Sequence, residues 1–233
     1  MVAVRQLTEQ AWPAMSIPLA LSTDNAFSKT THRDNPWTMW IRVLLMFGVE
    51  AIVSPPNSLG FTNHAEAVNW LWQDRTINRH RYGDLDDLAA DTPGFEYWAN
   101  HRRPILDPRI CGTRYPAEYV DRFAATLRWV PPGFDIGDYL DNTGTLRIPL
   151  TRGRVTFLRH VSRDHTINIA HTNWPVPNSL TIGVLVVAAI NTATGHLEIR
   201  HHGELVHRSD YPPSPATIDA YHPIPKHGLL DHL

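Results

Sequence analysis

Residues 19–25, with the sequence LALSTDN, and residues 49–56, with the sequence VEAIVSPP, decide the fold that we expect for this chain. The first run alternates and ends on Asp24, which is typical of a short strand whose last side chain leaves the sheet edge. The second run is mostly apolar. Pro55 and Pro56 stop it, because proline cannot continue a strand. Both runs therefore predict strands of one sheet.

A helix is predicted between these two strands. Asn35 suits the cap of that helix and Pro36 its first turn, and Gly48 suits its stop. Apolar residues recur between them at the helical period: Trp37, Ile41, Leu44 and Leu45. The chain from residue 19 to residue 56 therefore predicts a strand, a helix and a second strand.

A second helix is predicted after Pro56, and it has two distinct faces. Its apolar stripe contains Phe61, Ala65, Val68 and Trp72, whereas Glu66 lies among polar residues. A helix packed across the sheet can bring Glu66 beside Asp24, where two carboxylates can hold a divalent cation. Phosphoryl transfer on nucleic acid commonly uses such carboxylates around two metals.

These segments resemble the second half of the catalytic core of DDE transposases and retroviral-type integrases. Residues 21–25 (LSTDN) are similar to the family's second-acid motif, residues 48–56 to the strand and turn that follow it, and residues 64–69 (HAEAVN) to its third-acid motif. Residues 98–104 (WANHRRP) are similar to its aromatic-Asn-x-x-Arg-Pro element. Residues 112–118 (GTRYPAE) are similar to its Gly-x-x-Thr-Pro-x-Glu element. Together they span most of the chain.

The resemblance implies a DNA-acting enzyme with an RNase H-like core. Asp24 and Glu66 would be its catalytic residues and its ligands for Mg²⁺ or Mn²⁺, activating water or a DNA 3′-hydroxyl against a phosphodiester. The sequence departs from the family pattern because no first acid is visible before Asp24. Ala67 also replaces the usual arginine after the third acid. We therefore expect an amino-terminally truncated or degenerate transposase that binds metal poorly and supports little strand transfer.

Residues 146–212 change to a period of two, which predicts a small all-β module. Its expected strands are 146–150, 154–161, 166–170, 181–192, 196–202 and a short one through Val206. We expect these strands to close their own edges as an SH3-like barrel, which the resemblance supports.

The expected fold is therefore α+β with four parts. A partial RNase H-like core covers residues 1–103, and a helical, proline-rich connector covers residues 104–145. The β-barrel covers residues 146–212, and a flexible tail covers residues 213–233. Because the three strands that begin the family's sheet are unmatched, we expect an under-filled core near Asp24 and Ser54 and a tendency to self-associate.

Arginine carries almost all the positive charge of the chain. A net charge of −2 does not indicate nucleic-acid binding, but no acid interrupts the run that contains Arg152, Arg154 and Arg159. Arginine forks suit phosphate contacts, so a DNA-backbone surface and a solvated strand face both remain open for this run. The same choice, between DNA contact and favourable charge at a helix end, holds for Arg75 and Arg79. The resemblance adds four predicted DNA contacts: Asn25, Asn69, Arg102 and Arg103.

Composition places the chain in a general class. Its 233 residues, 42% of them hydrophobic, are enough to bury one or two cores. The single cysteine, Cys111, excludes a disulfide framework and fits a reducing cytoplasm. The most apolar segment, residues 180–190, is too short to span a bilayer. We expect a bacterial cytoplasmic protein, without membrane contact, that joins the nucleoid when bound to DNA.

Three functional classes follow from these observations. The first is a transposase or integrase component that uses Asp24 and Glu66. The second is a DNA-binding remnant without chemistry, and the third is an inert or protein-binding relic. The fourteen histidines do not add a fourth class. His201 and His202 are adjacent, so in a strand they point to opposite faces. Short paired spacings of a metal site are missing at five others: His32, His80, His101, His160 and His171.

Overall fold

The computed structural model describes residues 2–24, 37–56, 63–105, 114–122 and 127–211, together with Asp219 and Tyr221. The chain is a mixed α+β protein with two compact units. The first unit combines Met1–Ser58 with Arg128–Leu233, and the second unit is Leu59–Leu127. The second unit is therefore an insertion in the sequence of the first.

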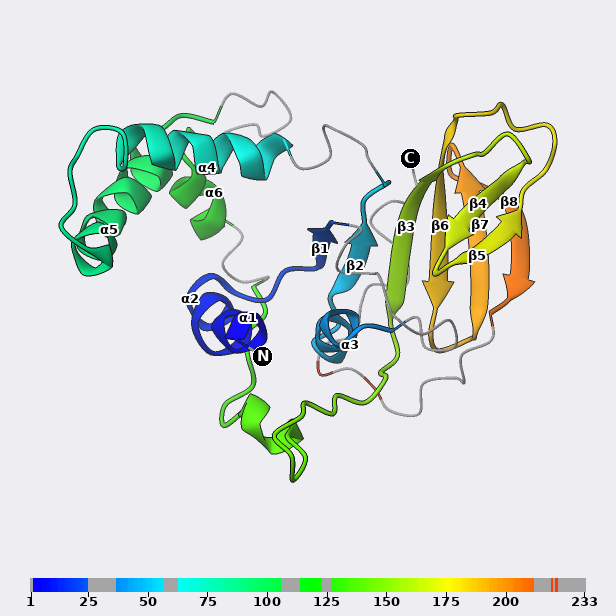
Figure 1. Cartoon of the computed structure of the whole chain (residues 1–233), viewed down its shortest axis with the longest axis horizontal. Helices are drawn as coiled ribbons and strands as arrows, with labels where there is room; N and C mark the ends of the chain where they lie inside the picture. The colour runs from blue at the N-terminus through cyan, green and yellow to red at the C-terminus, as the bar shows by residue number, and fades with distance from the viewer. Residues whose placement is uncertain are drawn as a thin grey trace. The chain divides into compact units, whose positions relative to one another are not determined.

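A six-stranded mixed sheet organises the first unit (Figure 1), in the order β1-β2-β3-β6-β7-β8. Its strands are β1 (Ala20–Thr23), β2 (Glu50–Val53), β3 (Arg154–His160), β6 (Leu185–Asn191), β7 (His196–His201) and β8 (Glu204–Asp210). β1, β2 and β3 pair in parallel, whereas β3, β6, β7 and β8 pair antiparallel. β4 (Thr166–Ile169) and β5 (Thr172–Pro175) form a separate hairpin.

Helix α3 (Met39–Met46) connects β1 to β2, which confirms the predicted strand–helix–strand order. The helix is capped by Thr38, whose Oγ1 accepts a hydrogen bond from the Ile41 amide at 3.3 Å. Asn35 and Pro36 lie outside the described residues. Gly48 follows the helix with a φ of 62°, as the predicted stop requires, because glycine adopts this conformation without a Cβ penalty.

The core of the first unit joins α3 to the sheet and to the amino-terminal helices. Leu44 and Leu45 of α3 are fully buried, as are Ala51 and Val53 of β2. Phe47 places its ring centroid 4.9 Å from that of Trp12 and 4.8 Å from that of Phe134, with the rings edge to face in both pairs. Burial of these apolar side chains is the main stabilising contribution here.

The amino-terminal helix changes type along its length. It consists of α1 (Val2–Arg5), a π-helical turn η1 (Gln6–Ala11) and α2 (Trp12–Met15). The Thr8 hydroxyl is buried within the helix and donates a hydrogen bond to the Val4 carbonyl oxygen at 3.0 Å.

The β-rich half of the chain follows the predicted strand pattern with two exceptions. Residues 146–150 form no strand: Leu146 makes only an isolated bridge to Leu140, and Pro149 lacks the amide that a ladder needs. Strand β5 was not predicted. The β4–β5 hairpin packs on the core through Ile167 and Ile169, and its Trp174 stacks on Tyr211 at 5.5 Å between ring centroids.

The structure divides the chain differently from the expected domains. β2 pairs in parallel with β3, so the β-rich segment continues the sheet that begins with β1. Val53 and Phe157 are partners across this junction, and both side chains are buried. Because β3 pairs with β2, the strands within 146–212 do not close on one another as the expected barrel requires. In the described sheet the edge strands are β1 and β8.

The second unit contains α4 (Asn63–Arg75), α5 (Leu85–His101) and α6 (Pro116–Arg122). Asp84 caps α5, because its Oδ1 accepts hydrogen bonds from the amides of Asp86 and Asp87 at 2.9 and 3.0 Å. Pro93 and Gly94 do not break α5, which continues to His101. Val68, expected on the apolar face of α4, is 49% exposed. The described helices include none with the length and apolar character needed to span a membrane.

Most of the expected 213–233 tail lies outside the described residues. Of its two described positions, Asp219 pairs with Arg152 at 3.0 Å. The Tyr221 amide donates a hydrogen bond to the Met46 carbonyl oxygen at 2.9 Å. These two residues are therefore attached to the first unit.

Candidate functional site

Asp24 directly follows β1, and its side chain is exposed. Beside it, Thr23 is the register partner of Val53, and the Ser54 amide donates a hydrogen bond to the Thr23 carbonyl oxygen at 3.0 Å. The carboxyl ends of parallel strands meet at the same edge of a sheet, where open α/β sheets commonly bind ligands. Asp24 and Ser54 therefore leave the sheet at one edge.

Two buried hydroxyl groups lie at this edge. Thr23 is 7% exposed and Ser54 is 5% exposed. Within the described part of the chain, neither Thr23 Oγ1 nor Ser54 Oγ has a hydrogen-bond partner. An unsatisfied buried polar group costs about 1–3 kcal/mol, so each hydroxyl needs a partner beyond the residues that the structure describes.

The Arg159 side chain extends from β3 to the carboxyl end of β2, and the residue is only 5% exposed. Its Nη1 donates hydrogen bonds to the carbonyl oxygens of Ser54 at 3.0 Å and Leu158 at 2.8 Å, and its Nε donates to that of Asn168 at 2.9 Å. Burial lowers the pKa of Arg159 to about 10, which leaves it charged at neutral pH. These bonds give Arg159 a structural role, and the DNA contact that the sequence predicts for it stays a prediction.

A buried carboxylate, which was not among the predicted site residues, lies at the amino end of β2. Glu50 is fully buried, and its Oε1 lies 3.3 Å from Nε of Arg154 and 2.5 Å from Oγ1 of Thr156, which donates to it. The Arg154 side chain is only 16% exposed, and its predicted contact with DNA stays a prediction. In the sequence, Glu50 is a single acid within an otherwise apolar strand, and this pattern indicates a buried charge that needs a partner.

Glu66 lies in the first turn of α4, and its side chain is exposed. Asn69 is exposed on the same helix, and Asn25 lies outside the described residues. Asp24 belongs to the first unit and Glu66 to the second, so their convergence on one cation stays a prediction. In the ranges that the structure describes, no three His, Cys, Asp or Glu side chains gather as a metal-binding group.

The run of arginines before and within β3 forms several internal pairs. Arg147 Nε lies 2.9 Å from Asp141 Oδ2, and Arg152 Nη1 lies 3.0 Å from Asp219 Oδ1. Arg152 remains about half exposed in its pair. Arg152 is therefore the member of the predicted set Arg152, Arg154 and Arg159 that still presents charge to solvent.

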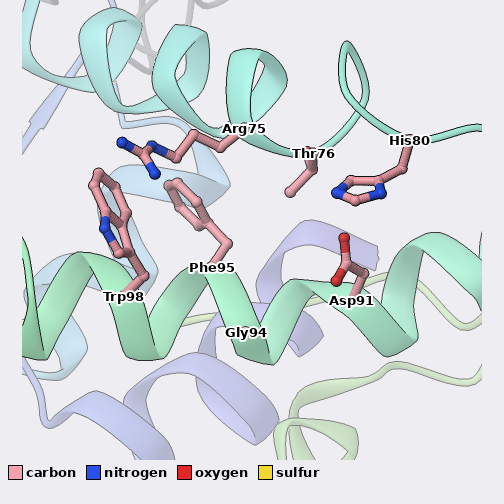
Figure 2. A pocket seen from close by; sticks show the side chains of 7 residues that line it. All are labelled: Arg75, Thr76, His80, Asp91, Gly94, Phe95 and Trp98. Carbon is pink, nitrogen blue, oxygen red and sulfur yellow. The ribbon is translucent and has the colours of Figure 1, made fainter.

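A pocket of about 170 Å³ lies between α4 and α5 in the second unit (Figure 2). The guanidinium of Arg75 stacks over the Trp98 ring, 3.7 Å from its centroid, and the Phe95 ring points into the same space. Asp91, on the pocket wall, accepts a hydrogen bond from the Tyr82 hydroxyl at 2.6 Å, which raises the pKa of Tyr82 to about 12. Stacking covers one face of Arg75 and leaves its edges for other contacts.

Three further arginines predicted to contact DNA are exposed in the second unit. Arg79 Nη2 lies 3.5 Å from Asp74 Oδ2, and an exposed pair of this kind contributes little stability. Arg102 and Arg103 follow α5, and their amides donate to the Trp98 carbonyl oxygen at 2.9 and 3.0 Å. DNA contact by these three side chains stays a prediction.

Comparison with family models, with curated proteins and with solved structures found no match to this chain. The candidate site in the first unit is therefore defined by its own residues, Asp24 and the hydroxyls of Thr23 and Ser54 beside it. Glu66 belongs to the second unit, and its place in the same site stays a prediction.

Proposed function

We propose that this chain is a transposase- or integrase-type protein that acts on DNA, with Asp24 and Glu66 as its catalytic acids. The observation that carries the proposal is the β1–α3–β2 unit, in which two parallel strands are joined by a helix and Asp24 stands at the end of the first. α4 follows with Glu66 in its first turn, which is the order of the family's second and third acids. A partial RNase H-like core belongs to the same proposal.

The chemistry of the donor atoms fits Mg²⁺ or Mn²⁺. Both ions take oxygen ligands, and Mg²⁺ is commonly held by one or two carboxylates with retained waters. Asp24 would be a direct ligand, and the Thr23 and Ser54 hydroxyls, which have no hydrogen-bond partner among the described residues, could donate hydrogen bonds beside it. A bound divalent ion would polarise a phosphodiester and lower the pKa of a bound water. Because only two acids of the family's three are matched, we propose weak activity.

A nicking assay on supercoiled plasmid with Mg²⁺ or Mn²⁺ tests the proposal. Asp24→Asn and Glu66→Gln should each reduce nicking to the level seen with a chelator, whereas Glu96→Gln, which removes another exposed helical acid, should not. Broadening of NMR signals by Mn²⁺ gives a readout that does not depend on activity. Equal nicking by all four proteins, together with unchanged Mn²⁺ broadening in both site variants, would remove the catalytic proposal.

DNA binding without chemistry is the second candidate function. The exposed positions of Arg102 and Arg103 at the end of α5 favour it. Arg102→Ala together with Arg103→Ala should flatten the dependence of log affinity on log salt by about 1.8, since each phosphate contact contributes about 0.9. Binding that survives Asp24→Asn without any nicking would select this candidate, and absence of DNA binding at low salt would leave the inert or protein-binding relic.

Self-association is proposed from the edge position of β1. An edge strand presents unpaired backbone groups to other chains, and β1 occupies one edge of the described sheet. Sedimentation velocity over a range of protein concentrations tests this. A monomer at all concentrations would contradict it.

A further inference from the structure

A second pocket, of about 210 Å³, lies in the first unit next to the short helix η4 (Ile136–Tyr139). Its walls are three aromatic rings, two carboxylates and a Pro131-Pro132-Gly133 turn. The rings belong to Phe134, Tyr139 and Tyr221, and the carboxylates belong to Asp135 and Asp138. No part of the proposed DNA chemistry uses this pocket.

The three rings are held at fixed angles to one another. Phe134 lies 6.1 Å from Tyr139, with the ring planes tilted by 32°, and 6.0 Å from Tyr221, with the planes at 82°. The Tyr139 and Tyr221 hydroxyls share a hydrogen bond of 2.6 Å. Phe47 packs edge to face on Phe134 from the core side, so the wall that Phe134 provides is rigidly supported.

The charge of this pocket is negative. Asp135 and Asp138 are exposed at its rim, and the described residues that line it include no lysine, arginine or histidine. Asp135 Oδ1 accepts a hydrogen bond from the Gly137 amide at 2.6 Å, which orients that carboxylate. Burial, followed by the hydrogen bond with Tyr221, raises the pKa of Tyr139 to about 12. The Tyr139 ring is therefore a neutral aromatic face at physiological pH.

We propose that this pocket binds an alkylated ammonium group between the rings of Phe134, Tyr139 and Tyr221. Aromatic faces attract organic cations within about 6 Å of the ring centroid, and aromatic cages recognise quaternary ammonium groups in this way. The two carboxylates add long-range attraction for the same charge. A volume of about 210 Å³ lies below the roughly 300 Å³ at which pockets for drug-sized ligands begin, so it suits one head group.

The head group has two chemically equivalent sources. One is the side chain of a methylated lysine in a peptide, and the other is a free choline-type molecule. A bare metal ion fits less well, because three of the walls are carbon surfaces and Asp135 already accepts an amide hydrogen bond.

The first test titrates the full chain with tetramethylammonium chloride and follows the amide NMR signals of Gly133 and Gly137. Sodium chloride at equal ionic strength is the control. Choline is compared with 3,3-dimethyl-1-butanol, its neutral isostere of nearly equal shape. We expect saturable shifts for both ammonium compounds and an affinity for the neutral alcohol at least about fivefold weaker. Equal affinity for choline and the alcohol, or no saturable shift with either ammonium compound, would overturn the proposal.

Variants test the residues of the pocket. Asp138→Asn and Tyr221→Leu should each weaken choline binding by about threefold or more, whereas Asp164→Asn, which removes an exposed acid from the β3–β4 turn, should not. Asp138 is exposed, so its variant should keep the fold and the test holds even if Tyr221→Leu does not. Choline binding unchanged in Asp138→Asn and folded Tyr221→Leu would contradict the site.

A final arm identifies the source of the ammonium group. A short peptide with one trimethyllysine is titrated against the same protein, with the unmethylated peptide as its control. Tighter binding of the methylated peptide than of choline would assign the pocket to a protein side chain. Binding of choline with equal or higher affinity would assign it to the free molecule.

Discussion

Glu50 and Arg154 form an ion pair inside the sheet, with Glu50 Oε1 lying 3.3 Å from Arg154 Nε and the Glu50 side chain fully buried. The pair crosses the β2–β3 junction. It links the β1–α3–β2 unit to the β-rich half of the chain, which the sequence alone places in separate domains. Breaking a buried pair leaves an uncompensated charge, so the pair should matter for stability well beyond an exposed one.

Arg154→Met should lower the free energy of unfolding by about 3–5 kcal/mol, measured by urea denaturation. Arg152→Met is the matched control, since its partner Asp219 is exposed, and it should change stability by less than about 1 kcal/mol. The double variant Glu50→Leu/Arg154→Met should regain most of the loss, because no buried charge remains. Equal stability of the two single variants would contradict this role for the pair.

Arg159→Met should destabilise the protein by about 1–3 kcal/mol, because the Ser54 and Leu158 carbonyl oxygens lose a buried hydrogen bond and the Asn168 carbonyl oxygen loses a partly buried one. Its DNA affinity, measured under conditions where the variant is folded, should stay within about twofold of the parent. A fully stable variant with strongly reduced DNA affinity would restore the DNA contact that the sequence predicted for this residue.

Gly94→Ala should raise the free energy of unfolding by about 0.5–1 kcal/mol, since glycine is unfavourable in a helix interior. An added Cβ would come no closer than 3.9 Å to Asp91 Oδ1. Gly144→Ala is the opposite case, because Gly144 has a φ of 74°, which strains a residue with a Cβ. It should lower stability. Chemical denaturation of both variants checks the pair, and a gain from Gly144→Ala would be inconsistent with the structure.

Asp141 should contribute a pH-dependent part of the stability. Hydrogen bonds from the Thr143 hydroxyl, the Thr145 amide and Arg147 hold the pKa of Asp141 well below its usual range. Because the folded-state pKa is lowered, the contribution is complete above the unfolded value of about 3.9 and is lost as pH falls below it. Thermal unfolding of Asp141→Ala should therefore show a deficit at pH 7 that shrinks between about pH 4 and pH 2. A deficit independent of pH would contradict this origin.

Local patterns in the sequence were sufficient to place most secondary structure. The alternation before Asp24 located β1, and the prolines after Val53 located the end of β2. The period of two located β3 and its antiparallel neighbours. The strand expected over 146–150 failed because Pro149 has no amide to donate. β5 was missed because its apolar residues do not alternate.

The pairing of distant segments could not be predicted in this way. Arg159 donates to the carbonyl oxygen of Ser54, 105 positions away, and no periodicity specifies which strand will cover the free edge of another. The expected positions of Asp24 after a strand and of Glu66 on a helix are confirmed, but their convergence stays a prediction. The pocket of Phe134, Tyr139 and Tyr221 depends on a contact between residues 82 positions apart, so its chemistry emerges only in the folded chain.

The insertion of the second unit divides the first unit into two stretches of chain that the sheet holds together without a direct covalent link. Ile17 forms a bridge with Arg128, whose guanidinium also donates to the carbonyl oxygens of Phe47 and Gly48 at 3.3 and 3.2 Å. A protease that cuts once within Leu59–Leu127 would therefore yield two fragments that co-migrate under native conditions and separate only in denaturant. The same stretches, expressed as separate polypeptides, should reassemble by strand complementation.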